Sequence, residues 1–224
     1  MIGPTVRAVL FDASGTLIRL RPPAPLLRAA LRDEGFTHPE ARVAAALRAE
    51  IAYYLAHHHE ASDDPTLQAL RRECASVLGD ALGGHHPPTE RLAQILIGSL
   101  QFELFPDVHP TLDGLSARGL LLAVVSNWDC GLLDVLAGLG VADRFAAIVP
   151  SAAVGVPKPQ PAVFEAALRR LGVEPSEAIH VGDRPETDAA GAAAAGIGAV
   201  TIDRRVRARQ GSISSLVALL GGPR

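Results

Sequence analysis

The sequence has few aromatic residues, few cysteines and no long apolar run. Phe, Trp and Tyr make up 4% of its 224 residues, and cysteine occurs only at Cys74 and Cys130. Two cysteines so far apart form neither a disulfide framework nor a zinc-binding motif, so we expect free thiols. No apolar run approaches the ~20 residues that a membrane-spanning helix needs. The sequence therefore predicts no membrane partner.

A strong excess of charge and a targeting signal are also missing. The formal net charge is -3, which argues against a general nucleic-acid-binding protein. Residues 1–5 lack the basic start and the long apolar stretch of a secretory signal. We therefore expect a cytoplasmic protein that does not bind nucleic acid.

An apolar segment that ends in polar residues is the first informative feature. Residues 6–11 are apolar except for Arg7, and Asp12, Ser14 and Gly15 follow them closely. Ligands of open α/β sheets bind outside the carboxyl ends of the strands, where this pattern places Asp12. An ordinary strand followed by an Asp-containing turn is the alternative, and this stretch alone leaves both open.

Strand and helix patterns alternate in the second half of the chain. Short apolar runs predict buried strands, and segments with helical spacing separate them. This order is typical of a parallel sheet with right-handed crossovers, so we predict an α/β fold. The predicted strands are 120–125, 145–149, 178–181 and 199–202, and the predicted helices are 112–117, 131–139, 162–171 and 189–195.

The segment between residues 19 and 103 has a different character. Its apolar residues recur at intervals of three and four, which predicts amphipathic helices and no strand. Prolines in residues 21–25 indicate an extended linker before the first helix. The sequence thus predicts a core of residues 1–18 and 104–224 with an inserted helical domain of residues 19–103. The predicted helices are 26–34, 39–58, 66–78 and 89–103.

Histidines cluster twice in this helical segment, at residues 57–59 and 85–86. Adjacent residues on a helix point about 100° apart, so they cannot all face one ion. No acidic or cysteine partner recurs nearby at ligand spacing. We therefore predict solvated or packing roles for these histidines.

Polar residues also follow two of the predicted strands. Ser126 and Asn127 follow one, Asp183 and Asp188 follow another, and Lys158 lies between two prolines on a stiff segment. Mg²⁺ prefers oxygen ligands and keeps waters that a substrate can replace. Lysine, hydroxyl and amide donors stabilise phosphoryl oxygens. Together with Asp12, these residues predict a site for Mg²⁺ and a phosphate.

With these motifs in order, the chain resembles the haloacid dehalogenase superfamily of hydrolases. The resemblance covers residues 1–18 and 104–224, whereas the insertion is similar to a C1-type cap in position and character only. It implies a Rossmann-like parallel sheet core with an inserted helical cap domain. The matching motifs are Phe11-Asp12-Ala13-Ser14-Gly15-Thr16-Leu17, Ser126-Asn127, Lys158, and Gly182-Asp183 with Asp188.

The resemblance also implies a role for each motif residue. Asp12 would be the nucleophile that takes the phosphoryl group as an aspartyl-phosphate. Ser126 and Asn127 would act on the substrate, and Lys158 would stabilise the nucleophile and the transferred charge. Asp183 would bind Mg²⁺ directly, and Asp188 would hold metal-bound water or orient its neighbours. The implied catalytic residues are Asp12, Ser14, Ser126, Asn127 and Lys158; substrate would contact Ser126, Asn127 and Lys158, and Mg²⁺ would contact Asp12, Ser14, Asp183 and Asp188.

Ser14 departs from the pattern of the family's phosphatases. Those enzymes usually have a second Asp at this position, which acts as general acid and then as general base. The carbonyl of Ser14 could still bind Mg²⁺, but its hydroxyl is too weak an acid to replace a carboxylic acid. General acid–base catalysis contributes ~10²–10⁴-fold, so we expect slow hydrolysis of alkyl phosphates and a smaller loss with acyl or aryl phosphates.

Three functions remain open on the sequence. The first is a Mg²⁺-dependent phosphatase of a small phosphorylated metabolite. The second is a haloacid-dehalogenase-type hydrolase that uses Asp12 as nucleophile; those relatives need no metal and typically lack the acidic pair formed here by Asp183 and Asp188. The third is a weakly catalytic phosphate-binding or regulatory module, which only Ser14 favours. The sequence identifies no particular substrate and is compatible with a monomer or a homodimer.

Overall fold

The chain folds into two structural units. The computed structural model describes residues 2–205 and 211–221. One unit, here called the α/β unit, comprises Met1–Arg19 and Glu103–Arg224, and the other, the helical unit, comprises Leu20–Phe102.

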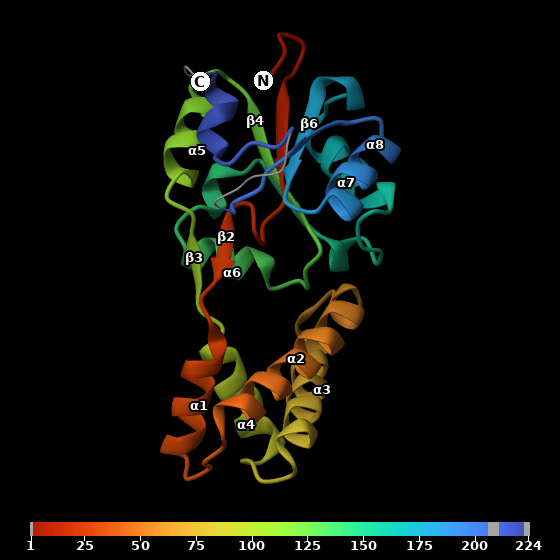
Figure 1. Ribbon diagram of the computed structural model, residues 1–224. Coiled ribbons are helices and arrows are strands. Elements are labelled where there is room, and N and C mark those ends of the chain that lie inside the picture. The colour runs from red at the N-terminus through yellow and green to blue at the C-terminus, as the bar shows by residue number, and fades with distance from the viewer. Residues whose placement is uncertain (1, 206–210, 222–224) are drawn as a thin grey trace. The chain divides into compact units, whose positions relative to one another are not determined.

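A five-stranded parallel sheet forms the centre of the α/β unit (Figure 1). The strand order is β5-β4-β1-β6-β7, which confirms the predicted parallel α/β fold. After β1 the chain builds one half of the sheet with β4 and β5, then returns to the other side of β1 with β6 and β7. The switch point of the sheet, where such folds bind ligands, is therefore β1. The strands are β1 (Ala8–Phe11), β4 (Leu121–Ser126), β5 (Ala147–Pro150), β6 (Ala178–Gly182) and β7 (Gly198–Thr201).

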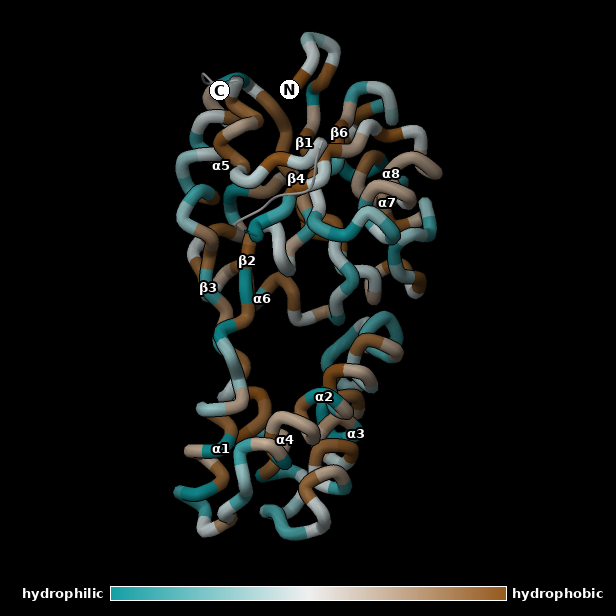
Figure 2. Tube along the Cα trace, viewed as in Figure 1, coloured by the Kyte–Doolittle hydropathy of each residue, from teal (hydrophilic) through white to brown (hydrophobic). Residues whose placement is uncertain are grey.

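Helices cover both faces of this sheet. Ala8 and Leu10 of β1 belong to the buried cluster that includes residues of α7 and α8, while α5 packs against β4 from the other side (Figure 1). Hydrophobic stretches concentrate along the strands, and the connecting loops are more hydrophilic (Figure 2). The helices are α5 (Val108–Ser116), α6 (Leu132–Gly138), α7 (Pro161–Leu171) and α8 (Ala190–Ala194), with short 3₁₀ helices at Ala142–Arg144, Ser151–Ala153, Pro175–Glu177 and Leu216–Leu220 and a π-helix at Pro185–Ala189.

Four helices form the helical unit, and their hydrophobic and hydrophilic residues alternate within each turn (Figure 2). Neighbouring helices pack through the buried residues of these turns, as predicted from the three- and four-residue spacing. Asp63 and Thr66 form a reciprocal capping box at the start of α3, which explains the sharp helix start there. The helices are α1 (Pro23–Asp33), α2 (Glu40–His57), α3 (Asp64–Leu82) and α4 (Thr89–Ser99), with a 3₁₀ turn at His58–Glu60.

Two local predictions were wrong at the ends of this unit. Helix α1 begins at Pro23, inside the predicted linker. The N–H groups of a first helical turn have no partner within the helix, so a proline, which lacks the N–H, is tolerated there. Helix α4 ends at Ser99, and Phe102–Leu104 forms β3, which pairs with β2 (Ile18–Leu20). This pairing joins segments that are far apart in the sequence, and helical periodicity within one segment cannot predict it.

No helix in the described part of the chain is long and apolar enough to cross a membrane.

Candidate active site

Asp12 lies at the switch point of the sheet. It follows β1 directly, its N–H donates to the Val181 carbonyl at 2.9 Å, and the residue is 6% exposed. In the sheet register Phe11 lies beside both Val124 of β4 and Val181 of β6. The polar residues that follow these three strands therefore emerge at one edge, as their parallel direction requires.

Lys158 joins two carboxylates beneath this edge. Its Nζ donates to Asp12 Oδ1 at 2.7 Å, to Asp188 Oδ1 at 2.6 Å and to the Val125 carbonyl at 3.0 Å. These contacts use all three N–H groups of the ammonium. Burial lowers the pKa of Lys158, but Asp12 and Asp188 outweigh it and hold the pKa above its usual value. Lys158 therefore remains a charged donor in a nearly closed environment.

The amide of Asn127 holds the backbone of Lys158. Asn127 Oδ1 accepts from the Lys158 N–H at 2.6 Å, and Asn127 Nδ2 donates to the Lys158 carbonyl at 3.1 Å. The following Lys158–Pro159 peptide bond is cis. Asn127 thus positions Lys158, and the predicted contact between Asn127 and substrate stays a prediction.

Ser126 contacts the same oxygen of Asp12 as Lys158 does. Its Oγ donates to Asp12 Oδ1 at 2.9 Å, and Ser126 is 1% exposed. Oδ1 accepts both hydrogen bonds that orient the Asp12 carboxylate. Neither of these two hydrogen bonds uses the other oxygen, Oδ2.

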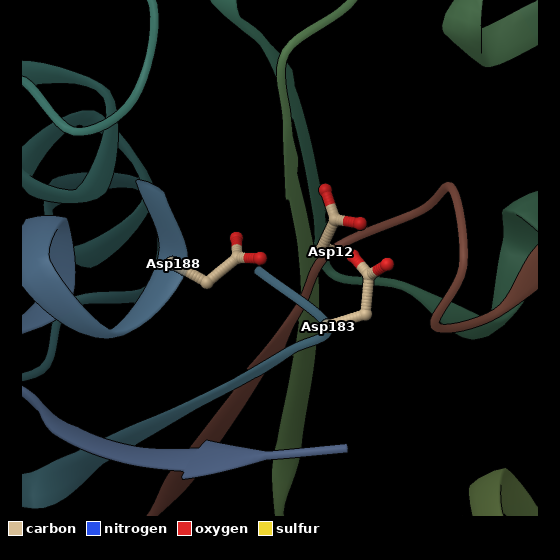
Figure 3. A group of neighbouring side chains, drawn as sticks. All are labelled: Asp12, Asp183 and Asp188. Carbon is tan, nitrogen blue, oxygen red and sulfur yellow. The ribbon is translucent and has the colours of Figure 1, made fainter. Parts of the chain in front are cut away.

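Three carboxylates converge at this point from separate segments of the α/β unit (Figure 3). Asp12, Asp183 and Asp188 each offer an oxygen, and these oxygens all lie within 4.8 Å of one another. It is the only cluster of potential metal ligands found in residues 2–205 and 211–221, so the described histidines form none. The cluster brings together Asp12, the predicted nucleophile, and the two predicted metal-binding residues Asp183 and Asp188.

Asp183 differs from Asp12 and Asp188 in its hydrogen bonding. Its Oδ1 is buried and has no hydrogen-bond partner among the described residues. Burial raises the pKa of Asp183 to about 6, and the charges of Asp12 and Asp188 add to this increase. Burial likewise raises the pKa of Asp12, although Lys158 counteracts it. An unpartnered carboxylate oxygen among like charges fits a divalent cation, which prefers such oxygen ligands.

Asp188, in contrast, is held at both oxygens. Oδ1 accepts from Lys158 and from His180 Nε2 at 3.0 Å, and Oδ2 accepts from the Arg184 N–H at 3.0 Å. Burial raises its pKa, but the hydrogen bonds from His180 and Lys158 outweigh this effect and keep the pKa below its usual value. Asp188 lies on the π-helix Pro185–Ala189, a type of turn that is frequent at functional sites. Its carboxylate is therefore charged and fixed in orientation.

Two glycines allow this close packing. A Cβ atom on Gly182 would lie 2.2 Å from Asp188 Cγ, and one on Gly15 would lie 2.4 Å from Asp183 Oδ2. Gly15 also has φ of +83°, a conformation that residues with a side chain rarely adopt. The loop after Asp12 therefore presses its backbone against the Asp183 carboxylate. Ser14, on this loop, is exposed, and its predicted role as a metal ligand stays a prediction.

His180 is the residue of this cluster that sequence reasoning missed. It lies within β6, is fully buried, and contacts the ring of Phe164 edge to face at a centroid distance of 5.0 Å. Burial lowers its pKa, so the ring is neutral and donates its Nε2 proton to Asp188. A histidine in an otherwise apolar strand, just before Gly182 and Asp183, was the available signal.

Comparison with protein families and curated sequences gives consistent matches. A family model described as haloacid dehalogenase-like hydrolase matches residues 6–196. The phosphoserine phosphatase of Thermus thermophilus is 31% identical over 231 residues, which cover 90% of this chain and 90% of that protein. The glyceraldehyde 3-phosphate phosphatase of Methanopyrus kandleri is 32% identical over 219 residues, which cover 89% and 84%. Mouse haloacid dehalogenase-like hydrolase domain-containing protein 3 is 41% identical over 111 residues, but this match spans only 44% of its length.

Solved structures of two kinds resemble the chain over nearly its full length. A HAD phosphatase from Thermococcus onnurineus has a TM-score of 0.66 and 26% identity, and covers 96% of both chains. A 2-haloacid dehalogenase from Pseudomonas syringae has a TM-score of 0.66 and 29% identity, also covering 96% of both. The similarity of the backbone therefore does not distinguish a phosphatase from a dehalogenase.

Proposed function

This chain belongs to the haloacid dehalogenase-like hydrolase family, and we propose that it is a Mg²⁺-dependent phosphatase acting on a small phosphorylated metabolite. The observation that carries the proposal is the cluster of Asp12, Asp183 and Asp188 with one unpartnered carboxylate oxygen. The full-length similarity to phosphatases of small metabolites supports it.

The chemistry proposed for Asp12 is nucleophilic attack through Oδ2. Lys158 and Ser126 hold Oδ1, which points the free oxygen away from them. An Oδ2–phosphorus bond forms while the ester phosphorus–oxygen bond breaks, and its electron pair leaves with the substrate oxygen. Water then attacks the phosphorus and gives up a proton to solvent, while the Oδ2–phosphorus bond breaks and its electron pair returns to Oδ2. This step releases phosphate and restores the Asp12 carboxylate. The Lys158 ammonium offsets negative charge during both steps.

Asp12 and Asp183, with Asp188 close by and the Ser14 carbonyl, would hold the Mg²⁺. Three carboxylates beside a single lysine would repel a phosphate. A Mg²⁺ ion held by these residues would neutralise this charge and polarise the phosphoryl oxygens. Because Asp188 is already held at both oxygens, we assign it the role of orienting Lys158.

Ser14 narrows the class of substrate. No carboxylic acid stands at this position to protonate the leaving oxygen, so the leaving group must depart as an anion or obtain its proton elsewhere. We therefore propose that acyl and aryl phosphates react faster than alkyl phosphates.

Dehalogenation is the second candidate, because a 2-haloacid dehalogenase shares 29% identity over nearly the whole chain. Asp12 would then attack carbon and displace a halide. The resemblance to dehalogenases implies no need for metal, so the acidic cluster weighs against this candidate. The effect of a chelator distinguishes the two reactions.

The deciding experiment measures hydrolysis of p-nitrophenyl phosphate and acetyl phosphate in Mg²⁺ and in EDTA. We expect turnover that requires the metal and that falls below about 10⁻³ of wild type in Asp12→Asn, because the nucleophile is lost. Asp33→Asn, at a side chain 72% exposed, is the matched control and should retain full activity. Dehalogenation of 2-chloropropionate that persists in EDTA, without phosphate hydrolysis, would establish the second candidate. Inactivity towards all three substrates would instead indicate a weakly catalytic binding module.

A further inference from the structure

Arg204 joins three segments of the α/β unit with a single guanidinium group. Its Nη1 donates to Asp107 Oδ1 at 2.9 Å and to Oδ2 at 2.8 Å, and its Nη2 donates to the Thr16 carbonyl at 2.5 Å. Its Cζ lies 3.9 Å from the centroid of the Phe105 ring. The side chain is 15% exposed. A planar, forked cation makes these contacts together, and an ammonium cannot reproduce them.

The Thr16 carbonyl belongs to the loop that directly follows Asp12. Within this loop of residues 13–18, the Ala13 carbonyl accepts the N–H groups of Thr16, Leu17 and Ile18 at 3.3, 2.9 and 2.9 Å. Gly15 N–H donates to the Ile18 carbonyl at 2.8 Å. These hydrogen bonds close the loop on itself.

Two hydrogen bonds from outside the loop reach its backbone carbonyls, in addition to the pairing of β2, which begins at Ile18, with β3. One is the hydrogen bond from Arg204 to Thr16, and the other runs from the Phe105 N–H to the Leu17 carbonyl at 3.0 Å. The guanidinium of Arg204 also lies over the Phe105 ring, so Arg204 contacts both the loop and the residue that donates the second hydrogen bond. A shift of this loop would move Gly15, whose backbone lies against the Asp183 carboxylate.

Asp107 anchors Arg204 to a rigid part of the fold. It immediately precedes α5, and its Oδ2 also accepts from Ser215 Oγ and from the Leu216 N–H, both at 2.7 Å. Burial raises the pKa of Asp107, but the hydrogen bonds from Arg204, Ser215 and Leu216 outweigh it and leave the pKa below its usual value. The carboxylate is therefore a charged partner for Arg204, and Ser215 and Leu216 also hold it by hydrogen bonds.

The loop and Phe105 also flank the connections to the helical unit. The chain leaves the α/β unit after Arg19 and returns to it at Glu103. Arg204 thus contacts the residues just before the departure and just after the return. Its guanidinium therefore contacts residues of the α/β unit on both sides of the inserted segment in the sequence.

We propose that Arg204 is a positioning residue, which holds the loop of residues 13–18, and with it the backbone of Gly15 against Asp183, in the arrangement that hydrolysis requires. It touches neither Asp12 nor any reacting atom. The activity part of this inference rests on the proposed function, whereas the contact between Arg204 and the loop does not.

The test compares Arg204→Gln with Arg205→Gln. Arg205 is the neighbouring arginine, is 63% exposed and pairs with Asp203, so it serves as a matched control. Two quantities are measured: amide hydrogen exchange of residues 13–18, and kcat and KM for p-nitrophenyl phosphate at a temperature where circular dichroism shows each variant folded. A role in global stability alone would raise exchange throughout the α/β unit and would leave kcat per folded molecule unchanged.

We expect exchange in residues 13–18 to rise about tenfold in Arg204→Gln, while β4 keeps its protection. The kcat should fall about tenfold, with KM changed less than about twofold, because misplaced site groups weaken the reaction more than binding. Arg205→Gln should match wild type in both measurements. If Arg204→Gln does not fold, Arg204→Lys, which keeps a charge opposite Asp107, is used with the same expectations in direction.

Unchanged exchange in residues 13–18, or a uniform increase along the unit, would overturn the inference. Faster exchange in these residues with an unchanged kcat would also overturn it, because hydrolysis would then not require the held loop. If wild type hydrolyses no phosphate ester in Mg²⁺, the proposed function fails, and the exchange data alone decide whether Arg204 holds the loop.

Discussion

Lys158 is the side chain on which the geometry of the site depends most. Its three hydrogen bonds orient Asp12, the proposed nucleophile, fix Asp188 and satisfy a strand carbonyl. Buried charges are costly unless they are paired and hydrogen-bonded, and removal of one partner leaves the other exposed to that cost. Lys158 and its two carboxylate partners therefore form one network of charges, and beside it the buried Oδ1 of Asp183 has no hydrogen-bond partner among the described residues.

Ser14 provides a direct test of what limits the reaction. In Ser14→Asp we expect kcat for an alkyl phosphate such as β-glycerol phosphate to rise about tenfold or more, because a carboxylic acid can protonate the leaving oxygen. The gain should be smaller for acetyl phosphate, whose leaving group needs little protonation. Both rates are measured by phosphate release.

Ser14→Asn is the matched control, since it has nearly the same shape as aspartate but no acidic proton. An equal gain in Ser14→Asn would contradict a general-acid explanation and would indicate a change in shape or binding.

Helices α2 and α3 bury a carboxylate between them. Glu50 of α2 is 4% exposed, and burial raises its pKa to about 7, although a hydrogen bond with Cys74 of α3 counteracts the increase. The folded state therefore retains a proton that the unfolded chain releases near the usual pKa of 4.5. It follows that the free energy of unfolding decreases as pH rises from about 4.5 to about 7.

Glu50→Gln should remove this dependence. We expect little difference in the melting temperature Tm between variant and wild type at pH 4.5, and a higher Tm for the variant at pH 8. The pKa shift of Glu50 corresponds to a change of about 3 kcal/mol in the free energy of unfolding between these pH values. Circular dichroism at the two pH values measures the difference.

His58 acts on stability with the opposite sign, because burial lowers its pKa to about 4. Its contribution is the same in both proteins, so it cancels when the Tm of wild type is subtracted from the Tm of Glu50→Gln. Glu40→Gln, at an exposed position of the same helix, should show no pH-dependent difference from wild type. A Glu50→Gln effect of equal size at both pH values would rule out titration of Glu50 as the cause.

For the complete protein, we expect Mg²⁺ binding at the acidic cluster to increase the stability of the folded state. A ligand that binds only the folded state stabilises it by about 2.7 kcal/mol at one hundred times its Kd. For a chain of this length, that corresponds to a rise in Tm of about 5–10 °C. We therefore expect Mg²⁺ alone, without substrate, to raise Tm at pH 7.5.

The increase should shrink as pH falls through about 6, because Asp183 then takes up a proton and loses its affinity for the cation. Differential scanning fluorimetry at pH 7.5 and pH 5.5 measures this change, and Asp183→Asn should abolish the increase at both. An equal Mg²⁺ effect in Asp183→Asn would place the cation outside this cluster.

The residues of the site could largely be predicted because local patterns mark them. Asp12 and Asp183 each follow an apolar strand and Ser126 is the last residue of one, and parallel strands bring such ends to one edge. The alternation of strands and helices likewise predicts the sheet, since each element must bury its own apolar residues. These features depend on short-range periodicity and on strand direction, both of which are written in consecutive residues.

Only the tertiary structure decided which of these residues contact one another. The contacts of Asn127 with Lys158, of His180 with Asp188 and of Arg204 with Thr16 all join different segments of the chain. The pairing of β2 with β3 does the same, and it overrode helical periodicity. Such contacts depend on which elements become neighbours after folding, and no local pattern records a partner that lies in another element.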